Sequence, residues 1–393
     1  MTDKIPLTWT KIKISDLFEE TCEKNHSNAE VLTIIQGVGT VPREQSGREI
    51  IYDKNSLAGY KFVKKGDFII HLRSFEGGLE VANSDGIVSP AYIILRPKIE
   101  VSTTYLYALF HTNRFINQTM APAVEGARDG RSVKYDVLKQ QKILFPPLSE
   151  QKKIAEILAT QDRVIELKEK LIAEKQSQKK YLMSELLGDD FKKPFKLNGV
   201  IIDKKKWERK KLGDVCVFRD SERRPIKEGN RKKGLYPYYG ASGIIDYVED
   251  YIFDGSFILL GEDGANIIFR SSPLAFKVEG KIWVNNHAHV LVPKAGNDID
   301  FLVNRLESLN YEKFNTGTAQ PKLNQDVIEK IEVFMPSLPE QKAIADVLSA
   351  ADEEISLLQK DLEQEKLKKK SLMQLLLTGL VRVKTFRSHI NER

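Results

Sequence analysis

Cysteine is scarce in this sequence: Cys22 and Cys216 are the only two among 393 residues. Because they are isolated, the sequence offers neither a disulfide framework nor the paired-cysteine spacing of a zinc or redox site. We expect both to be small buried side chains in the reducing cytoplasm. Long hydrophobic runs are also lacking. No stretch of about 18 apolar residues occurs, which excludes a membrane-spanning helix, and the start MTDKIPLTWTKIKI lacks the apolar core of a signal peptide.

The chain has little excess charge, but the excess is unevenly distributed. The formal net charge is +6. Residues 204–233 hold 13 Lys and Arg against 5 Asp and Glu, a local balance of +8, so the rest of the chain sums to −2. Such a segment suits a polyanion-binding surface, and a solvated lysine-rich loop is the alternative that the pattern leaves open. With 41% hydrophobic and 30% charged residues, the chain is typical of globular proteins, and its length indicates two or more domains.

One segment occurs twice. PPLSEQKKIAEILATQD ends at Asp162 and PSLPEQKAIADVLSAAD ends at Asp352, a shift of 190 residues. Each opens a stretch without Pro or Gly, which predicts two helices of about 39 residues and about 58 Å. Ser337 and Glu340 fit a capping box, and the prolines at 147 and 339 are tolerated only in a first turn. Glycines at 188 and 379 fall where left-handed C-caps are expected.

Apolar residues recur along both stretches with the 4-3 spacing of a coiled-coil seam. Long blocks between the copies favour antiparallel pairing within one chain, with core helices of a bundle as the alternative. Lys168, Lys175 and Lys179 interrupt the first seam. The residues predicted to pair the helices are Ile154, Leu158, Ile165, Ile172 and Leu182 in the first, and Ile344, Leu348, Ile355, Leu358, Leu362 and Leu372 in the second.

The blocks before the two helices share only their ends. WTKIKISDLF resembles WERKKLGDVC, and YDVLKQQKILFPP resembles QDVIEKIEVFMPS, whereas the sequences between differ. Both contain short β-branched and aromatic runs split by Gly, Asp and Asn, which predict strands and turns. Each also holds a helical segment near its end, TYLYALFHTNRFINQTM or DFLVNRLESLN. We predict two mixed α/β domains of about 145 residues. They would share a common frame, formed by their similar first and last segments, and differ in the residues between.

These motifs together resemble a known family. The doubled P-x-L-x-E-Q-x-x-I-A-x-x-L-x-x-x-D helix start, the terminal LLLTGLVRV, GDFIIHLRSFEGG with GIVSPAY, and YYGASGIIDYV with LLGEDGA and NNHAHVL are similar to those of type I restriction–modification specificity subunits. The likeness covers essentially the whole chain. It implies an α+β fold in which two mixed α/β target-recognition domains are separated by two long helices that pair as an antiparallel coiled coil. The expected parts are residues 1–145 and 189–335 for the domains (the latter with a linker), 146–188 and 336–379 for the helices, and 380–393 for a tail.

The resemblance also implies a noncatalytic function. Each domain would read half of an asymmetric bipartite site in double-stranded DNA. The subunit would recruit two adenine methyltransferase subunits and, for cleavage, ATP-driven restriction subunits that translocate and cut DNA, all in the cytoplasm and without a membrane. No cofactor is expected. The alternatives are a coiled-coil scaffold that binds only proteins, a specificity module of a different methyltransferase or nuclease system, and a self-contained enzyme.

Motifs for catalysis are missing from the sequence. SPAY, at Ser89 to Tyr92, lacks the second proline of an amino-methyltransferase motif, and the Gly280–Lys281 pair lacks the upstream glycine of a P-loop. GEDGAN lacks the ligand spacing of an EF-hand. His287 and His289 share a strand face by their spacing and could begin a metal site, but no third ligand is evident, so we predict no metal and favour a core or base-contacting role.

Residues that suit DNA readout gather in glycine-flexed or basic segments. Arginine suits guanine, glutamine and asparagine suit adenine, and cations bind phosphates, while plain surface exposure is the alternative for any one residue. In the first domain the predicted contacts are Arg43, Arg48, Arg73, Arg128, Arg131, Ser132 and Lys134. In the second they are Arg219, Arg223, Arg224, Lys227, Arg231, Lys232, Lys233, Tyr238, Tyr239, Gln320, Lys322 and Asn324, with Tyr236 and Thr318 beside them.

Overall fold

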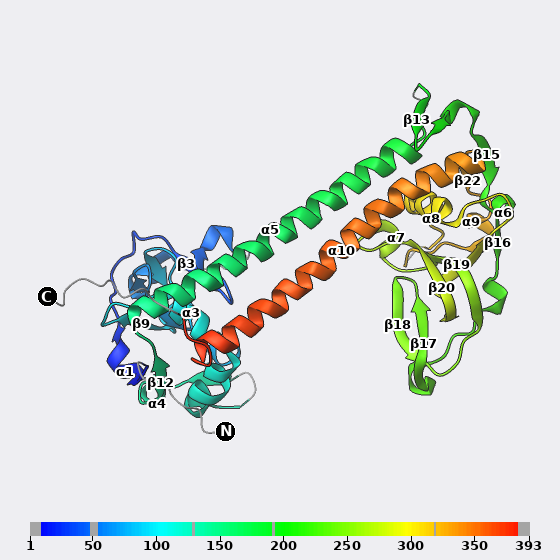
Figure 1. Cartoon of the computed structure of the whole chain (residues 1–393). Helices are drawn as coiled ribbons and strands as arrows, with labels where there is room; N and C mark the ends of the chain where they lie inside the picture. The colour runs from blue at the N-terminus through cyan, green and yellow to red at the C-terminus, as the bar shows by residue number, and fades with distance from the viewer. Residues whose placement is uncertain (1–8, 48–53, 128–129, 191–192, 318–319, 384–393) are drawn as a thin grey trace. The chain divides into compact units, whose positions relative to one another are not determined.

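The computed structural model describes residues 9–47, 54–127, 130–190, 193–317 and 320–383 (Figure 1). The predicted contacts Arg48, Arg128 and Thr318 lie outside these residues. None of the helices in the described ranges combines the length and the apolar character needed to cross a membrane. The chain divides into two compact units, unit 1 with Met1–Lys168 and Leu362–Arg393, and unit 2 with Glu169–Asp361. Each unit therefore holds one domain and one half of each long helix.

Unit 1 contains a four-stranded antiparallel sheet of order β2-β9-β6-β7, together with the pairs β3–β4, β5–β8 and β10–β11. Its core includes Phe68, whose ring packs edge-on against Phe18 and Phe110. Its strands are β2 (Phe18–Thr21), β3 (Leu32–Ile35), β4 (Gly39–Pro42), β5 (Lys61–Val63), β6 (Phe68–Ile70), β7 (Glu80–Val81), β8 (Gly86–Val88), β9 (Ile93–Pro97), β10 (Val124–Glu125) and β11 (Ser132–Val133). Its helices include α1 (Ile14–Leu17), α2 (Ser74–Gly77), α3 (Thr103–Phe110) and α4 (Tyr135–Leu138).

Unit 2 contains a six-stranded sheet of order β16-β21-β19-β20-β17-β18. All neighbours in it are antiparallel except β17 and β20. The strands are β16 (Cys216–Phe218), β17 (Lys233–Gly240), β18 (Gly243–Val248), β19 (Phe253–Gly261), β20 (Ala275–Val284) and β21 (Ala288–Pro293), with the hairpin β13 (Phe195–Leu197) and β14 (Val200–Ile202). The helices include α6 (Leu212–Val215), α7 (Asn266–Phe269), α8 (Ile299–Glu307) and α9 (Gln325–Ile328).

Despite these unlike sheets, both domains close in the same way. β1 (Thr10–Lys13) pairs with β12 (Lys142–Phe145), and β15 (Glu208–Lys211) pairs with β22 (Glu332–Met335), both antiparallel. A buried tryptophan, Trp9 or Trp207, precedes each first strand. Each last strand leads directly into a long helix, α5 (Leu148–Leu187) or α10 (Leu338–Leu377). The sequence similarity at the ends of the two blocks thus marks a common frame, in which the first and last strands of a domain meet.

The glutamate of each repeated helix start anchors the helix to its own domain. Glu150 accepts hydrogen bonds from Trp9 Nε1 at 3.1 Å and from the Arg382 guanidinium at 2.7 and 2.6 Å. Glu340 accepts from Trp207 Nε1 at 3.4 Å and from a backbone N–H before that tryptophan at 3.0 Å. Burial alone would raise the pKa of each carboxyl, but these hydrogen bonds outweigh burial and lower both pKa values.

The glutamine that follows makes a second matched anchor. Gln151 accepts from the Ser102 N–H at 3.0 Å and donates to the carbonyl of the proline five residues before it at 2.9 Å. Gln341 makes the same bonds, to the Asp298 N–H at 2.8 Å and to its own preceding proline at 2.9 Å. Ser102 and Asp298 are the N-caps of α3 and α8. The repeated Glu-Gln pair therefore fixes each long helix to equivalent parts of two different domains.

The two long helices contact each other in antiparallel fashion within each unit (Figure 1). In unit 1, Ile154 and Leu158 of α5 share a core cluster with Leu376 of α10. In unit 2, Leu186 of α5 shares one with Ile344 of α10 and its neighbours. Of the predicted seam residues, the buried ones are Ile154, Leu158, Ile172, Ile344, Leu348, Ile355 and Leu362, and the half-buried ones are Ile165, Leu182, Leu358 and Leu372.

Lysines on the first seam form ion pairs between the helices. In unit 2, Lys179 Nζ lies 2.6 Å from Asp352 Oδ1, and Lys175 Nζ lies 2.7 Å from a nearby α10 glutamate. In unit 1, Lys369 Nζ lies 2.5 Å from Asp162 Oδ1, which is the same pair shifted by 190 residues. Lys175 and Lys179, which interrupt the first predicted seam, therefore bind the other helix and help to set its register.

The ends of the helices differ from each other. Gly379, after α10, has φ +74 and is the left-handed cap expected there. Gly188, after α5, is not left-handed, which corrects our expectation. A side chain at this position would clash, because its Cβ would lie 2.3 Å from the Ser184 carbonyl oxygen. Instead, Lys204 donates to a carbonyl in the last turn of α5 at 2.8 Å and to the Gly188 carbonyl just after the helix at 2.7 Å, and Arg305 donates to the last carbonyl of α5. Cations at this end also complement the helix dipole.

We expect Glu340→Gln to destabilise unit 2 by about 2–4 kcal/mol, because a neutral amide cannot accept all the N–H and O–H groups that meet this buried carboxylate. The Ser337 N–H and hydroxyl, at 3.0 and 2.7 Å, are among them. Chemical denaturation at pH 7 measures the loss, with Glu353→Gln, an exposed change on the same helix, as the control. An equal effect of the two substitutions would contradict the anchor.

The same anchor predicts a dependence on pH. Because the folded pKa of Glu340 lies below its usual value of 4.5, its stabilisation is present above about pH 4.5 and is lost as the pH falls through the lowered pKa. Thermal unfolding from pH 7 downward should therefore show a steeper loss of stability below this point in the wild type than in Glu340→Gln. Parallel curves for the two proteins would count against it.

The two cysteines occupy different environments. Cys216 is buried at the start of β16, and burial raises the pKa of its thiol to about 12. Cys22 is exposed, which corrects the expectation that both are buried. It directly follows the last residue of β2, where the chain leaves the sheet.

Candidate nucleic-acid interface

The first domain presents its predicted DNA-binding loop on the β10–β11 hairpin, with Glu125 opposite Ser132. Arg131 lies over the Phe75 ring, 4.3 Å from its centroid, and 3.5 Å from Glu76. Lys134 Nζ lies 3.9 Å from Glu125, and Ser132 is exposed. The hairpin therefore has an ordered base with polar side chains at its surface.

Two other predicted arginines of this domain lie on different segments. Arg73 is exposed directly before α2, the helix that contains the residues contacted by Arg131, so the structure brings these two arginines to one short helix. Arg43 begins the 3-10 helix η1 (Arg43–Gln45), where its guanidinium lies 5.8 Å from the Tyr60 ring centroid and Nε lies 3.4 Å from Thr33 Oγ1. The arginines thus do not all belong to one loop.

In the second domain, several predicted contacts are exposed. Lys233 begins β17, and Asn324 is the N-cap residue of α9. Lys322 is about half exposed, and its Nζ lies 3.2 Å from Glu262 Oε1. Among the residues that the structure describes, the exposed candidate cations of this domain without an ion pair are Arg224, Lys227 and Lys233, and the neutral candidates Gln320 and Asn324 are exposed as well.

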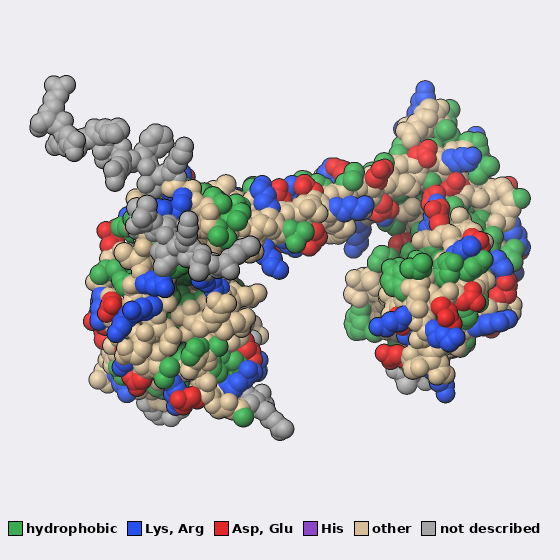
Figure 2. Space-filling view, turned by 60° about the horizontal axis from the view of Figure 1, so that its bottom comes forward, with side chains coloured by type: hydrophobic (Ala, Val, Ile, Leu, Met, Phe, Trp, Pro, Cys, Tyr) green, Lys and Arg blue, Asp and Glu red, His purple; other side chains and the backbone are tan. Residues whose placement is uncertain are grey.

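Carboxylates offset much of the basic excess in residues 204–233. The Arg231 guanidinium lies 3.5 Å from Asp246, and Lys232 Nζ lies 2.9 Å from Glu249. Arg219 also forms a two-pronged pair with Glu222, an acid that the balance of +8 already counts. On the face in view in Figure 2, Lys and Arg side chains are interspersed with Asp and Glu. The local balance of +8 therefore overstates the positive field of this segment.

The structure corrects the prediction that Tyr238 contacts DNA, because this residue is buried. Its side chain is 1% exposed, and its hydroxyl accepts a hydrogen bond from the Ile226 N–H at 2.9 Å. The Arg231 guanidinium covers its ring at 4.7 Å from the centroid. Tyr238 therefore supports the basic segment from beneath, while Tyr239 is half-buried, with its ring 6.1 Å from that of Phe276.

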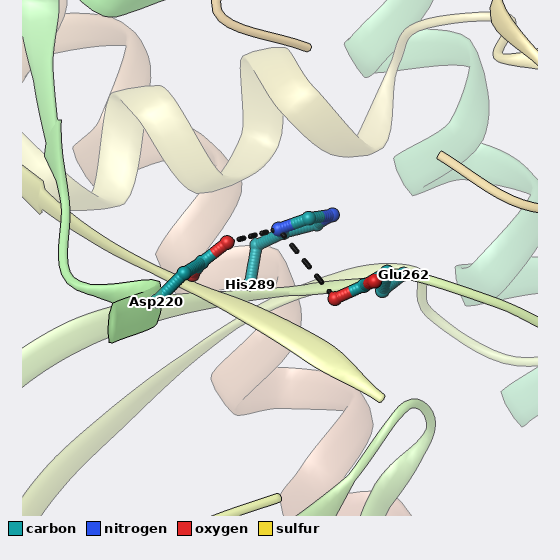
Figure 3. Close-up of side chains that lie close together, drawn as sticks. All are labelled: Asp220, Glu262 and His289. Atoms are coloured by element: carbon teal, nitrogen blue, oxygen red, sulfur yellow. Dashed lines mark hydrogen bonds and ion pairs between the residues drawn. The ribbon is translucent and has the colours of Figure 1, made fainter. Parts of the chain in front are cut away.

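The two histidines of NNHAHV have different surroundings. His287, directly before β21, is about half exposed, and its Nδ1 lies 2.7 Å from Asp263 Oδ2. His289, on β21, is buried, and its Nδ1 lies 2.5 Å from Asp220 Oδ2 and 3.9 Å from Glu262 Oε2 (Figure 3). The ligand atoms of Asp220, Glu262 and His289 all lie within 4.8 Å of one another, the spacing of a metal site.

An arginine takes the place of a metal in this cluster. Arg223, predicted as a DNA contact, lies 3.3 Å from Asp220 Oδ2 and 2.6 Å from Glu262 Oε2. A divalent cation bound to the same oxygens would meet this guanidinium at close range and be repelled. Sequence reasoning missed both carboxylates, although each stands out as an acid, one in the basic stretch FRDSERR and one in GEDGAN.

Unit 1 has its own buried polar cluster, around Glu80. This carboxylate accepts hydrogen bonds from the Gly37 N–H at 2.7 Å and the Tyr107 hydroxyl at 3.3 Å, and it lies 3.1 Å from His111 Nε2. Burial opposes both charges, but their hydrogen bonds outweigh it, so the pKa of Glu80 is lowered and that of His111 is raised. The cluster ties the turn after β3 to the end of α3.

Comparison with known proteins agrees with this organisation. The family model described as the type I restriction modification DNA specificity domain matches residues 6–175 and again residues 204–367. A type I restriction enzyme specificity subunit of Haemophilus influenzae is 36% identical over 143 residues, which span 36% of this chain and 37% of that relative. The MjaVIII specificity subunit of Methanocaldococcus jannaschii is 26% identical over 97% of this chain and 95% of its own.

A solved structure shares the fold. The S subunit of a type I restriction–modification system from M. genitalium superposes with a TM-score of 0.57 at 18% identity, covering 96% of this chain and 99% of that one. This likeness, with the two long helices and the doubled domain, confirms the predicted fold class. The expectation of a specificity subunit rather than an enzyme in its own right is confirmed by the family match. Because the family model covers most of the chain, the protein belongs to the type I restriction–modification specificity subunits and carries two copies of their DNA specificity domain.

Proposed function

We propose that this subunit recognises an asymmetric bipartite site in double-stranded DNA, with residues 1–145 reading one half and the domain within 189–335 reading the other. The observation that carries the proposal is a common frame around unlike fillings. Both domains close with an antiparallel pair of end strands and the same Glu-Gln anchor, yet one contains a four-stranded sheet and the other a six-stranded sheet. Two different surfaces presented in one manner suit two different half-sites.

The exposed candidates divide by chemistry into two groups. Amide side chains such as those of Gln320 and Asn324 suit base edges, whereas the cations Arg73, Arg224, Lys227 and Lys233 suit guanine or phosphate. Phosphate contacts would supply most of the affinity and the amides much of the discrimination. Arg131 and Ser132 offer the corresponding pair in the first domain.

The long helices, residues 146–188 and 336–379, would set the spacing of the half-sites and recruit partners. The chain carries the type I restriction modification DNA specificity domain twice, and we infer that it works in a complex with other subunits. We infer two methyltransferase subunits and, for cleavage, ATP-dependent restriction subunits. An exposed leucine occurs at the same position of each helix, Leu167 at 48% and Leu357 at 57%, one in each unit. A feature offered twice suits two copies of one partner.

Specific DNA binding should weaken steeply with added salt. If the four exposed cations named above each neutralise one phosphate, the plot of log K against log salt should have a slope of about −4 or steeper. Fluorescence anisotropy measures this slope on a DNA duplex that carries the sequence methylated by the reconstituted complex. Arg224→Gln with Lys227→Gln should reduce its magnitude by about 2, whereas Lys360→Gln, an exposed control on α10, should leave it unchanged. A slope near zero for the wild type would contradict the proposed phosphate contacts.

A scaffold that binds only proteins is the second candidate. The pairing of Arg219, Arg231 and Lys232 with carboxylates favours it, because paired cations attract DNA less. A gel shift of the purified chain, with and without methyltransferase subunits, separates the two. DNA binding in either sample supports the recognition function, and assembly with the methyltransferase without any DNA binding supports the scaffold.

A further inference from the structure

Four charged or polar side chains of unit 2 form a buried network below the segment Gln320–Asn324. Its members come from separate parts of the domain: Asp220 and Arg223 from the turn after β16, Glu262 from just after β19 and His289 from β21. Figure 3 shows three of them, Asp220, Glu262 and His289. Their side chains are between 1% and 13% exposed. Lys322, in the segment itself, joins the network at its surface.

Charge within this network is balanced by its own members. Arg223 contacts both carboxylates, at 3.3 Å from Asp220 and 2.6 Å from Glu262. The second oxygen of Asp220 accepts from the Val290 N–H at 2.8 Å, and that of Glu262 lies 3.2 Å from Lys322 Nζ. Every carboxylate oxygen therefore has a partner. The network holds protein segments together and has no oxygen left over for a metal or a ligand.

His289 connects the network to the backbone of the Gln320–Asn324 segment. One ring nitrogen, Nδ1, lies 2.5 Å from Asp220 Oδ2, and the other, Nε2, lies 2.8 Å from the Leu323 carbonyl oxygen. The histidine ring therefore bridges the turn after β16 and the segment through both of its nitrogens.

The same segment is held at further points by Glu262 and its neighbours. The Leu323 N–H donates to the Glu262 carbonyl at 2.7 Å, and the Gly264 N–H donates to the Pro321 carbonyl at 3.0 Å. Leu323 is completely buried, while Gln320 and Asn324 on either side of it are exposed. The backbone is therefore fixed beneath two amide side chains that point away from the core.

We propose that His289 is a positioning residue for DNA recognition: it fixes the backbone of Gln320–Asn324 so that both amides meet base edges in one orientation. The inference rests on the proposed function, since it assumes that this segment reads DNA. An amide that bonds a base at two points discriminates only if its backbone is held to within a fraction of an ångström. Arg223 and Glu262 act with it by holding Asp220 and Lys322.

The test compares His289→Gln with wild type in complex with the methyltransferase subunits, using duplexes with single base changes in either half-site. We expect discrimination at one or more positions of the half-site read by the second domain to fall at least tenfold. Discrimination at the other half-site, and the slope of affinity against salt, should stay within twofold of wild type. A merely structural role would instead weaken binding to every duplex together.

Val278→Ala is the matched control, because Val278 is buried in β20 within a core cluster that contains none of the network residues. At a similar loss of melting temperature, this variant should keep its discrimination. If His289→Gln does not fold, Arg223→Lys takes its place with the same expectation. This change keeps the positive charge but removes the guanidinium that contacts Asp220 and Glu262 together.

Three results would overturn the inference: unchanged discrimination in the folded variant, an equal loss at both half-sites, or the same loss in Val278→Ala. A wild-type complex that binds all duplexes equally would overturn the proposed function as well. A wild type that discriminates, with a variant that discriminates equally well, would overturn only the role of His289.

Discussion

Replacing residues 1–145 with the first domain of another specificity subunit should change one half of the recognised DNA site and leave the other half unaltered. The reason is that the contacts joining domain to helix belong to the frame: Trp9 to Glu150, and the N-cap Ser102 to Gln151. A donor domain with a tryptophan and an N-cap at these places should dock on the same helix start. Mapping of methylated bases in DNA modified by the reconstituted complex reads out both halves.

The reciprocal exchange is the control for this prediction. Replacing residues 207–335 should change only the other half, because Trp207 to Glu340 and Asp298 to Gln341 repeat the frame. If either exchange altered both halves together, the two domains would not be independent readers. A transplanted domain that lacks the tryptophan should fold poorly, because the buried glutamate then loses a hydrogen-bond partner.

Lengthening both long helices by seven residues should lengthen the nonspecific spacer between the half-sites. A copy of the α10 heptad Ile355–Asp361 inserted after Lys168 and again after Asp361 keeps the seam spacing and adds about 10 Å to each helix. At about 3.4 Å per base pair, the spacer should grow by up to about three base pairs, with slower methylation because the twist of DNA also rotates the second half-site. Methylated-base mapping measures the new spacer.

An insertion into α5 alone is the control for the heptad experiment. It should shift one helix against the other and break register-setting pairs such as Lys179–Asp352 and Asp162–Lys369. We expect that variant to lose melting temperature and methylation rather than gain a new spacer. An unchanged spacer in the double insertion would show that the helices do not determine the separation of the half-sites.

Periodic sequence features predicted the helical part of the fold well. The apolar 4-3 repeat extends far enough to define both long helices, and Ile154 and Ile344 are fully buried where it places them. The lysines on the first seam could not be understood in this way. Lys179 is explained by Asp352, a residue 173 positions away whose approach depends on antiparallel register.

The roles of the repeated glutamate and glutamine could not be derived from their neighbours in sequence. Glu150 meets Trp9 from 141 positions away, and Gln151 meets Ser102 from 49 positions away. The doubled motif marked these residues as significant, but only the folded domain reveals the donors. A capping box accounted for Glu340 in part, since its carboxylate does accept the Ser337 N–H.

Counting charges in sequence gave the candidate interface only approximately. It could not separate Arg223, held by Asp220 and Glu262, from Arg224, which is exposed. Similarly, Tyr238 seemed a surface aromatic beside a basic run, whereas its strand turns it into the core. Two things decide which cations and aromatic rings reach the surface: acidic residues from remote strands that pair with the cations, and the face of the sheet toward which each side chain points. Local composition determines neither.

The central claim is that one chain holds two different readers of DNA at a constant separation. Mapping of methylated bases in DNA modified by the wild-type complex tests it most directly. The account predicts a motif of two unlike half-sites separated by a spacer of one length in all its occurrences. A single continuous motif, two identical half-sites, or a spacer that varies in length would contradict it.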